Sequence, residues 1–284
     1  MIPRLHLFEL EDLEWFPARI RDFGTDFIHF VETRIELHKA IVPLLGDALR
    51  RTGSTRVVDL CSGGSGPIAN IAKDLAQEGL DVQFMLTDRF PNIAAFERVV
   101  GESEGRIVYS CEPVNALSVS PDLVAFRTII NAFHHFRPDT ARAILRDAVA
   151  VGQPIAIFEI PERTVRTILP MFLTPLFVWL ATPFIRPFSW LRLLFTYLIP
   201  IVPLCSLWDG VVSQLRAYRD VDLRKMTEGL GGGEYEWRAG WAPVPSIRGK
   251  VTWLIGLPKK MLAAESPALG SPAAATTASN PAEG

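Results

Sequence analysis

The 284-residue sequence has few cysteines and no excess of positive charge. Its three cysteines, Cys61, Cys111 and Cys205, lie far apart, and an odd number without paired spacing argues against a disulfide framework and a zinc site. Lys and Arg number 29 against 31 Asp and Glu, so the chain has no overall positive field to hold a nucleic acid. We therefore expect a reducing compartment, no bound metal and no nucleic-acid partner.

Charged residues are also scarce: they make up 21% of the chain, hydrophobic residues make up 49%, and mean hydropathy is +0.21. This composition is apolar for a water-soluble protein. The apolar residues concentrate in 167–208, where only Arg186 and Arg192 are charged. Because six prolines interrupt this segment, the sequence predicts broken helices rather than one straight membrane-spanning helix.

Patterns along the chain predict an α/β fold with helical additions. Short runs rich in β-branched residues alternate with helical stretches between about 56 and 160, which is typical of βαβ units and a mostly parallel sheet. Two later strand-like runs, 235–242 and 250–257, indicate an antiparallel C-terminal pair. The expected divisions are an N-terminal helical cap at 1–53, an α/β core at 54–166, an apolar helical insertion at 167–208, a C-terminal helix and strand pair at 209–262, and a disordered tail at 263–284.

The most informative segment is 57–67, VVDLCSGGSGP, which predicts a buried strand followed by a loop of small residues. Small residues let backbone N–H groups approach a ligand, and the N-terminus of a following helix attracts negative charge. Asp88 follows the next predicted strand, 25 residues after Gly63, where a carboxylate can accept hydrogen bonds from both hydroxyls of a ribose. A simple tight turn and a helix N-cap are the structural alternatives for the loop and for Asp88.

The segment VVDLCSGGSGP followed by LTDRF resembles class I S-adenosylmethionine-dependent methyltransferases over roughly residues 55–160 and, more weakly, 209–258. The resemblance implies a Rossmann-like methyltransferase fold with a seven-stranded sheet, and S-adenosyl-L-methionine as cofactor. It implies that Asp59 orders the loop or meets the methionine amino group, that Gly63 lies under the methionine part, and that Asp88 holds the ribose. Cys61 and Ser65 depart from the family, which usually has glycine at both positions.

On this resemblance, Asn115 stands in for the acid that many members place near the adenine amino group. The full set of expected cofactor-binding residues is Asp59, Cys61, Ser62, Gly63, Gly64, Gly66, Asp88, Arg89, Asn115 and Asn131.

Residues 64–69, GSGPIA, also match the G-x-G-x-x-A pattern of NAD(P)-dependent oxidoreductases, and Asp88 lies at an acceptable distance from it. Two features favour the methyltransferase interpretation. Asp59 lies in the first predicted strand just before the loop, which dinucleotide binding does not require, and the chain leaves no room for a substrate domain of ordinary size. The oxidoreductase stays the less favoured alternative.

The stretch NAFHHF at 131–136 follows the fourth predicted strand and resembles the His-His-Phe stretch that lines the cleft of ubiquinone- and sterol-type methyltransferases. Neutral imidazole accepts a proton near pH 7, so His134 and His135 are candidate general bases. Glu159, which ends the fifth predicted strand, is a candidate to hold the substrate or orient a histidine. Adjacent loop residues usually point in different directions, so a metal pair is not expected. Packing roles for the histidines and an ion pair for Glu159 stay open.

Together these patterns predict an S-adenosylmethionine-dependent methyltransferase that acts on an apolar or lipid-like small molecule at the cytoplasmic face of a membrane. The alternative is a membrane-associated S-adenosylmethionine-binding protein without methyl transfer. We expect the insertion to cover the cleft and dip into the leaflet, with Arg186 and Arg192 near lipid phosphates and Arg216 and Tyr218 as head-group contacts. A buried lid on a soluble cytoplasmic protein and a two-pass hairpin are the alternatives. Acidic residues within 9–14 predict that no export signal is present.

Overall fold

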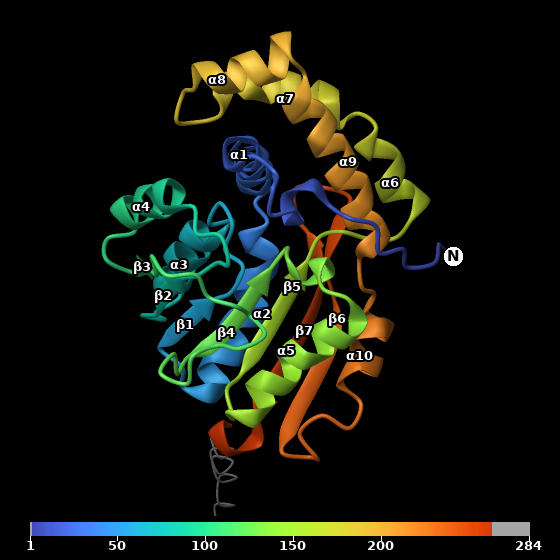
Figure 1. Cartoon of the computed structure of the whole chain (residues 1–284). Helices are drawn as coiled ribbons and strands as arrows, with labels where there is room; N and C mark the ends of the chain where they lie inside the picture. The colour runs from blue at the N-terminus through green and yellow to red at the C-terminus, as the bar shows by residue number, and fades with distance from the viewer. Residues whose placement is uncertain (1, 263–284) are drawn as a thin grey trace, which may run out of the picture.

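A seven-stranded sheet lies at the centre of the computed structural model, which describes residues 2–262 (Figure 1). Its strand order is β3-β2-β1-β4-β5-β7-β6, with bounds Arg56–Asp59 (β1), Gln83–Leu86 (β2), Ile107–Tyr109 (β3), Phe126–Ile130 (β4), Ile155–Glu159 (β5), Tyr235–Val244 (β6) and Gly249–Pro258 (β7). β1 to β5 pair in parallel, whereas β7 runs antiparallel to both β5 and β6. The prediction of a Rossmann-like methyltransferase fold with an antiparallel C-terminal pair is confirmed. The predicted disordered tail, 263–284, lies outside the described residues.

Helices cover both faces of the sheet, which explains why every residue of β4 and β5 is buried. One face carries α2 (His38–Thr52), α3 (Ile68–Gln77) and α4 (Ile93–Glu102), and the other carries α5 (Pro138–Ala150) and α10 (Asp220–Thr227). Each set shares one apolar cluster with the strands. A short turn, η5 (Lys259–Met261), follows β7.

The predicted N-terminal cap divides into two helices with different neighbours. α2 packs on the sheet, whereas α1 (Ala18–Arg34), which follows the turn η1 (Leu10–Asp12), lies above the carboxyl ends of the parallel strands (Figure 1). The apolar residues Phe23 and Phe27 of α1 pack against Val178 of the insertion. α1 is therefore held between the insertion and the edge of the sheet.

The apolar insertion forms an arch of broken helices above α1 (Figure 1). The arch comprises α6 (Val165–Met171), α7 (Thr174–Ala181), η3 (Thr182–Phe184), α8 (Trp190–Leu193), the π-helical turn η4 (Leu194–Leu198) and α9 (Ile201–Arg216). Within residues 2–262, no single helix has the length and composition to cross a membrane, but two helix pairs bent by 52° and 77° pass this test together. α9 continues through the expected boundary at residue 208 because no proline lies between Pro203 and its end.

Arg192 lies inside the arch, so the expectation that it contacts lipid phosphates is wrong. Its side chain is buried, and its Nη2 lies 3.0 Å from Oδ2 of Asp26 in α1. It also donates hydrogen bonds to the carbonyls of Ile185 and Pro187. A buried guanidinium needs such partners to offset its lost hydration. Arg192 thus ties the insertion to α1, whereas Arg186 is exposed.

Candidate functional site

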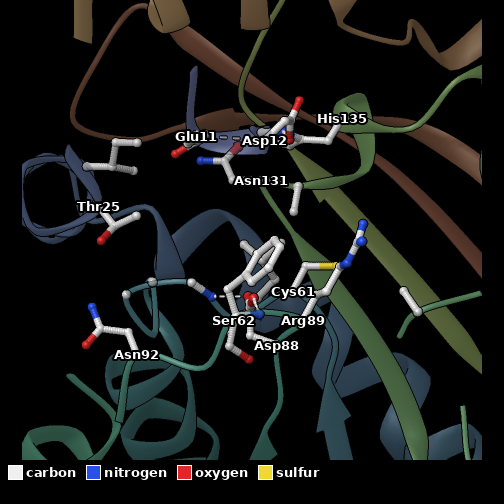
Figure 2. A pocket seen from close by; sticks show the side chains of 18 of the residues that line it. Glu11, Asp12, Thr25, Cys61, Ser62, Asp88, Arg89, Asn92, Asn131 and His135 are labelled. Carbon is white, nitrogen blue, oxygen red and sulfur yellow. Dashed lines mark hydrogen bonds and ion pairs between the residues drawn. The ribbon is translucent and has the colours of Figure 1, made fainter. Parts of the chain in front are cut away.

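A cavity of about 510 Å³ lies at the carboxyl ends of β1, β2 and β4, beneath α1 and η1 (Figure 2). Open α/β sheets bind ligands at this edge, and the volume falls in the range of small-molecule sites. The floor is formed by the loop after β1 and by Asp88 after β2. Glu11, Asp12 and His135 line the cavity on the side away from Asp88 (Figure 2).

The loop after β1 adopts left-handed backbone conformations at four positions: Cys61 (φ 62°), Gly63 (φ 50°), Ser65 (φ 76°) and Gly66 (φ 48°). This explains why glycine is usual in such loops, since a Cβ raises the energy of this conformation. Glycine at 64 has a different cause. A Cβ there would lie 3.3 Å from Cβ of Thr25, because α1 crosses the loop closely.

Asp59 lies behind the loop and does not line the cavity. Its Oδ1 accepts a hydrogen bond from Thr128 Oγ1 at 2.6 Å, and its Oδ2 accepts one from Ser62 Oγ at 2.7 Å. Burial raises the pKa of Asp59 to about 7, against these two hydrogen bonds, which lower it. Of the two roles implied by the resemblance, this geometry suits the ordering of the loop.

Asp88 lies at the cavity floor, and backbone N–H groups donate hydrogen bonds to both of its carboxylate oxygens. Oδ2 accepts from Gly63 at 2.8 Å and Oδ1 accepts from Phe90 at 2.7 Å. A carboxylate offers about four lone-pair positions, so two acceptor positions are left for a ligand. The side chain is thus fixed in place and still able to accept two hydroxyl groups.

The other expected cofactor contacts lie around the same cavity. Its lining includes Cys61, Ser62, Gly63, Gly64, Gly66, Asp88, Arg89, Asn115 and Asn131. Arg89 pairs with Glu14 at 3.0 Å, and both side chains are exposed. Asn115 Oδ1 accepts from the Leu117 N–H at 3.0 Å, which shapes the loop after β3. The structure therefore brings together all of these residues except Asp59, and their contacts with the cofactor stay predictions.

The two histidines of η2 (Phe133–His135) have different surroundings. His134 is buried, and its Nδ1 lies 2.6 Å from Oε2 of Glu159, whose Oε1 accepts from the Phe133 N–H at 2.7 Å. Neither His134 nor Glu159 lines the cavity, whereas His135 does. Glu159 therefore orients His134 and the turn from behind, as one of the sequence interpretations expected.

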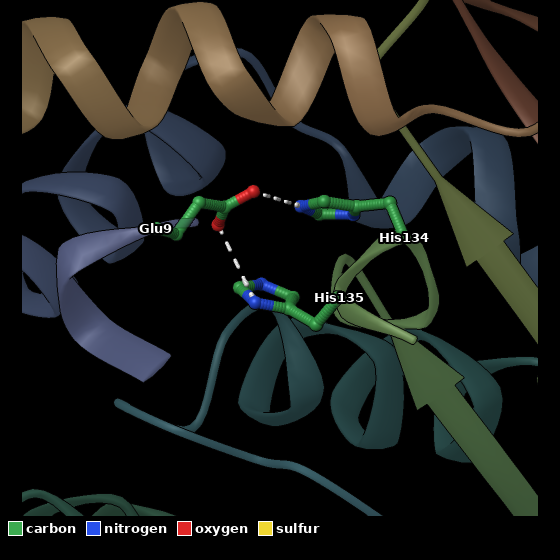
Figure 3. A group of neighbouring side chains, drawn as sticks. All are labelled: Glu9, His134 and His135. Carbon is green, nitrogen blue, oxygen red and sulfur yellow. Dashed lines mark ion pairs between the residues drawn. The ribbon is translucent and has the colours of Figure 1, made fainter. Parts of the chain in front are cut away.

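Glu9 lies beside both histidines with one carboxylate oxygen directed at each, although the sequence did not mark it as a site residue (Figure 3). It is fully buried, with Oε1 4.0 Å from Nε2 of His134 and Oε2 3.3 Å from Nδ1 of His135. These three residues are close enough to share a metal ion. Nη1 of Arg216, however, lies 3.0 Å from Glu9 Oε1, so a cation already accompanies the carboxylate. We assign the group to internal charge balance.

Tyr218 is buried outside the cavity lining, so the expectation that it contacts a lipid head group is wrong; Arg216 is buried but lines the cavity, and its head-group contact stays a prediction. Besides Glu9, Arg216 pairs with Asp12 at 2.7 Å. The Tyr218 hydroxyl donates to the Phe136 carbonyl at 2.7 Å, and the Arg4 guanidinium lies 4.1 Å from its ring centre. Both residues hold the N-terminal segment against the turn that carries the histidines.

The acids around His135 change its chemistry. Burial alone would lower its pKa, but the carboxylates of Glu9, Asp12 and Glu11 outweigh burial and raise the pKa to about 10. At neutral pH His135 is then protonated and donates hydrogen bonds. Burial, with the charges of Glu9 and Asp209, raises the pKa of Glu11 to about 8. General-base action by His135 stays a prediction, and it requires loss of this proton.

Sequence reasoning missed the contribution of the N-terminal region. Thr25, His29 and Glu32 of α1 and Glu11 of η1 line the cavity. The closely spaced acids at 9–14 were a visible feature of the sequence, but nothing local showed that Glu9 would be buried. Glu32 offered no comparable sign, since it lies in a helix with other charged residues.

No protein-family model and no curated protein matches the chain. Solved structures with a similar fold include an O-methyltransferase family protein from Burkholderia thailandensis (13% identity, TM-score 0.45, covering 81% of this chain and 58% of that one). Another is the plantazolicin methyltransferase BpumL in complex with SAH (9% identity, TM-score 0.45, covering 84% of this chain and 88% of that one). A third is magnesium protoporphyrin IX methyltransferase from Synechocystis PCC 6803 with bound SAM (10% identity, TM-score 0.39, covering 78% of this chain and 79% of that one). The chain thus spans 58% of the length of the Burkholderia protein.

Proposed function

We propose that this protein transfers a methyl group from S-adenosylmethionine to an apolar or lipid-like small molecule. The observation that carries the proposal is the cavity in which Asp88, at the end of β2, faces the left-handed loop after β1. The antiparallel placement of β7 next to β5 also favours this activity over an NAD(P)-dependent oxidoreductase, whose dinucleotide-binding sheets follow the order 3-2-1-4-5-6.

The cavity residues suit the parts of this cofactor. Asp88 would hold the ribose hydroxyls, and the small residues Gly63 and Gly64 would lie beside the methionine part. Phe90 and the loop around Asn115, which line the same cavity, would flank the adenine. When bound, S-adenosylmethionine supplies an electrophilic methyl group on a positively charged sulfur.

The residues of the chain would position the methyl acceptor and take up the proton that it releases. The cavity residues would hold the acceptor atom in line with the methyl group, and sulfur would keep the electron pair of the carbon–sulfur bond. A hydroxyl acceptor would release a proton, and Glu11, a cavity-lining carboxylate with a raised pKa next to His135, would take it. His135, held protonated, would orient Glu11, since its Nε2 lies 3.5 Å from Oε1 of Glu11. Most of the rate gain in such a displacement comes from alignment.

The arch supports the proposal of an apolar acceptor and a membrane face. Its outer surface exposes many large apolar side chains, among them Leu169, Phe172, Leu176, Phe177, Leu180, Phe184, Phe188, Trp190, Leu198 and Leu204. Such a surface exceeds the scattered apolar residues of ordinary soluble proteins, and exposed Arg166 and Arg186 could meet lipid phosphates beside it. Because α9 ends at the cavity with Arg216, the arch would connect the bilayer with the site. Localisation at the cytoplasmic leaflet is part of this proposal.

Vesicle binding tests the membrane part of the proposal. We expect the intact protein to sediment with anionic phospholipid vesicles without detergent. The double variant Trp190→Ser, Leu198→Ser should bind about tenfold less, because both side chains, 76% and 77% exposed, would otherwise enter the leaflet. Val124→Ser, Trp241→Ser is the matched control, since these exposed side chains lie outside the arch. Wild-type protein that stays in the supernatant would overturn the membrane proposal.

Transfer of a labelled methyl group from S-adenosylmethionine into a lipid extract tests the proposed activity as a whole.

A further inference from the structure

Glu32 is a buried acid of α1 with one unused carboxylate oxygen at the cavity. Its side chain is almost fully buried, yet it lines the cavity. Oε1 accepts a hydrogen bond from Asn131 Nδ2 at 2.6 Å. Oε2 is shielded from solvent and accepts no hydrogen bond from the residues that the structure describes. A buried acceptor without a donor is costly, so such an oxygen points to a ligand group.

Two contacts fix where Oε2 faces. A Cβ on Gly66 would lie 3.5 Å from Oε2, so this oxygen is directed at the small-residue loop after β1. His29, one turn earlier in α1, has its Nδ1 2.7 Å from the Gly66 carbonyl oxygen, which holds the helix against the same loop. The unused oxygen therefore lies where the methionine part of the proposed cofactor would pass.

Asn131 orients Glu32. Its Oδ1 accepts a hydrogen bond from the Ile160 N–H at 2.9 Å, which leaves Nδ2 to donate to Glu32 Oε1. The sequence predicted Asn131 as a cofactor contact, and this geometry gives it a positioning role. Burial raises the pKa of Glu32 to about 7, against the hydrogen bond from Asn131. A cation beside Oε2 would favour the ionised form.

Asp59, which the resemblance offered for the methionine amino group, does not line the cavity. Both of its oxygens accept short hydrogen bonds from Thr128 and Ser62 behind the loop. Glu32 lines the cavity, and its Oε2 is buried and accepts no hydrogen bond from residues 2–262. We propose that Glu32 Oε2 receives the α-ammonium group of S-adenosylmethionine, so that α1 completes the cofactor site in place of the acid in β1. This inference rests on the proposed function.

Calorimetric titration with two ligands tests the inference without any turnover. S-Adenosylhomocysteine carries the α-ammonium group, and its deamino analogue has hydrogen there. We expect wild-type protein to prefer S-adenosylhomocysteine by about tenfold or more, as for one charge-assisted hydrogen bond. Glu32→Gln should lose most of this preference while its affinity for the deamino analogue stays within about threefold of wild type. Glu36→Gln, the next acid along the chain and outside the cavity lining, should keep the preference.

The outcomes separate the inference from the proposed function. If wild-type protein binds neither ligand, the proposed function fails. If wild-type protein binds both ligands equally, the proposed function stands but Glu32 does not bind the ammonium group. This outcome overturns the inference without any variant. If Glu32→Gln weakens both ligands by the same factor, Glu32 only shapes the cavity and the inference is overturned. Thermal unfolding of each variant shows whether it has folded.

Discussion

Asp88→Ala is expected to weaken the binding of S-adenosylhomocysteine by about 10²-fold or more, because two charge-assisted hydrogen bonds to the ribose would be lost. The carboxylate also accepts the N–H groups of Gly63 and Phe90, so its removal frees the two loops that form the cavity floor. Both effects act in the same direction. Isothermal titration calorimetry at constant ionic strength measures the change.

Asp81→Ala provides the control for Asp88→Ala, because Asp81 is exposed and lies just before β2. The affinity of Asp81→Ala for S-adenosylhomocysteine should stay within about twofold of wild type, because most surface substitutions have small effects. Similar unfolding temperatures for both variants would confirm that the sheet is intact. Equal affinity of Asp88→Ala and wild type would remove Asp88 from the cofactor site.

Glu11→Gln is expected to lower the methyl-transfer rate to a hydroxyl acceptor by about 10²-fold or more, since it removes the proposed proton acceptor. Cofactor affinity should change little. The pKa of Glu11 is raised to about 8, so its carboxyl group is mostly protonated at pH 7 and becomes a base above pH 8. The wild-type rate should therefore rise with pH through about 8 and level off above it, with an apparent pKa that belongs to the coupled acids and His135. The Gln variant should lose this rise.

Two further variants distinguish Glu11 from its neighbours. Glu14→Gln changes an exposed acid of the same segment and should keep both rate and pH profile. His135→Ala removes a positive charge that lowers the pKa of Glu11, so the rise should move to higher pH. If His135→Ala instead abolishes transfer at every pH while Glu11→Gln is fully active, His135 is the base, as the sequence alone suggested.

The sheet and the loop after β1 were predictable because their sequence signals are local. Alternation of β-branched runs with helical stretches marks the strands, and the run of small residues after Asp59 marks a loop that must take left-handed conformations. Asp88 follows from its position after the next strand. Such features depend on neighbours in the sequence and on the edge at which parallel strands end.

The part of the site that the N-terminal segment forms was not predictable in this way, because it arises from contacts between segments that are distant in the sequence. Glu9 meets residues of η2 and α9 only when the N-terminal segment folds over the sheet. Arg192 pairs with Asp26, which lies 166 positions away in the sequence. Because this partner cannot be recognised from the sequence, the arginine in an apolar segment was predicted to contact lipid. The resemblance suggested Asp59 for the amino group, yet this acid lies behind the loop with its oxygens bonded to Thr128 and Ser62, outside the cavity lining.

The most direct test of the account is transfer of a labelled methyl group. Purified protein is incubated with methyl-labelled S-adenosylmethionine and a lipid extract, and label in the organic phase is measured. We expect protein-dependent labelling that excess S-adenosylhomocysteine suppresses and that the Asp88→Ala variant lacks. Tight binding of S-adenosylmethionine without labelling of any lipid or small-molecule fraction would contradict methyl transfer and leave a binding protein in its place.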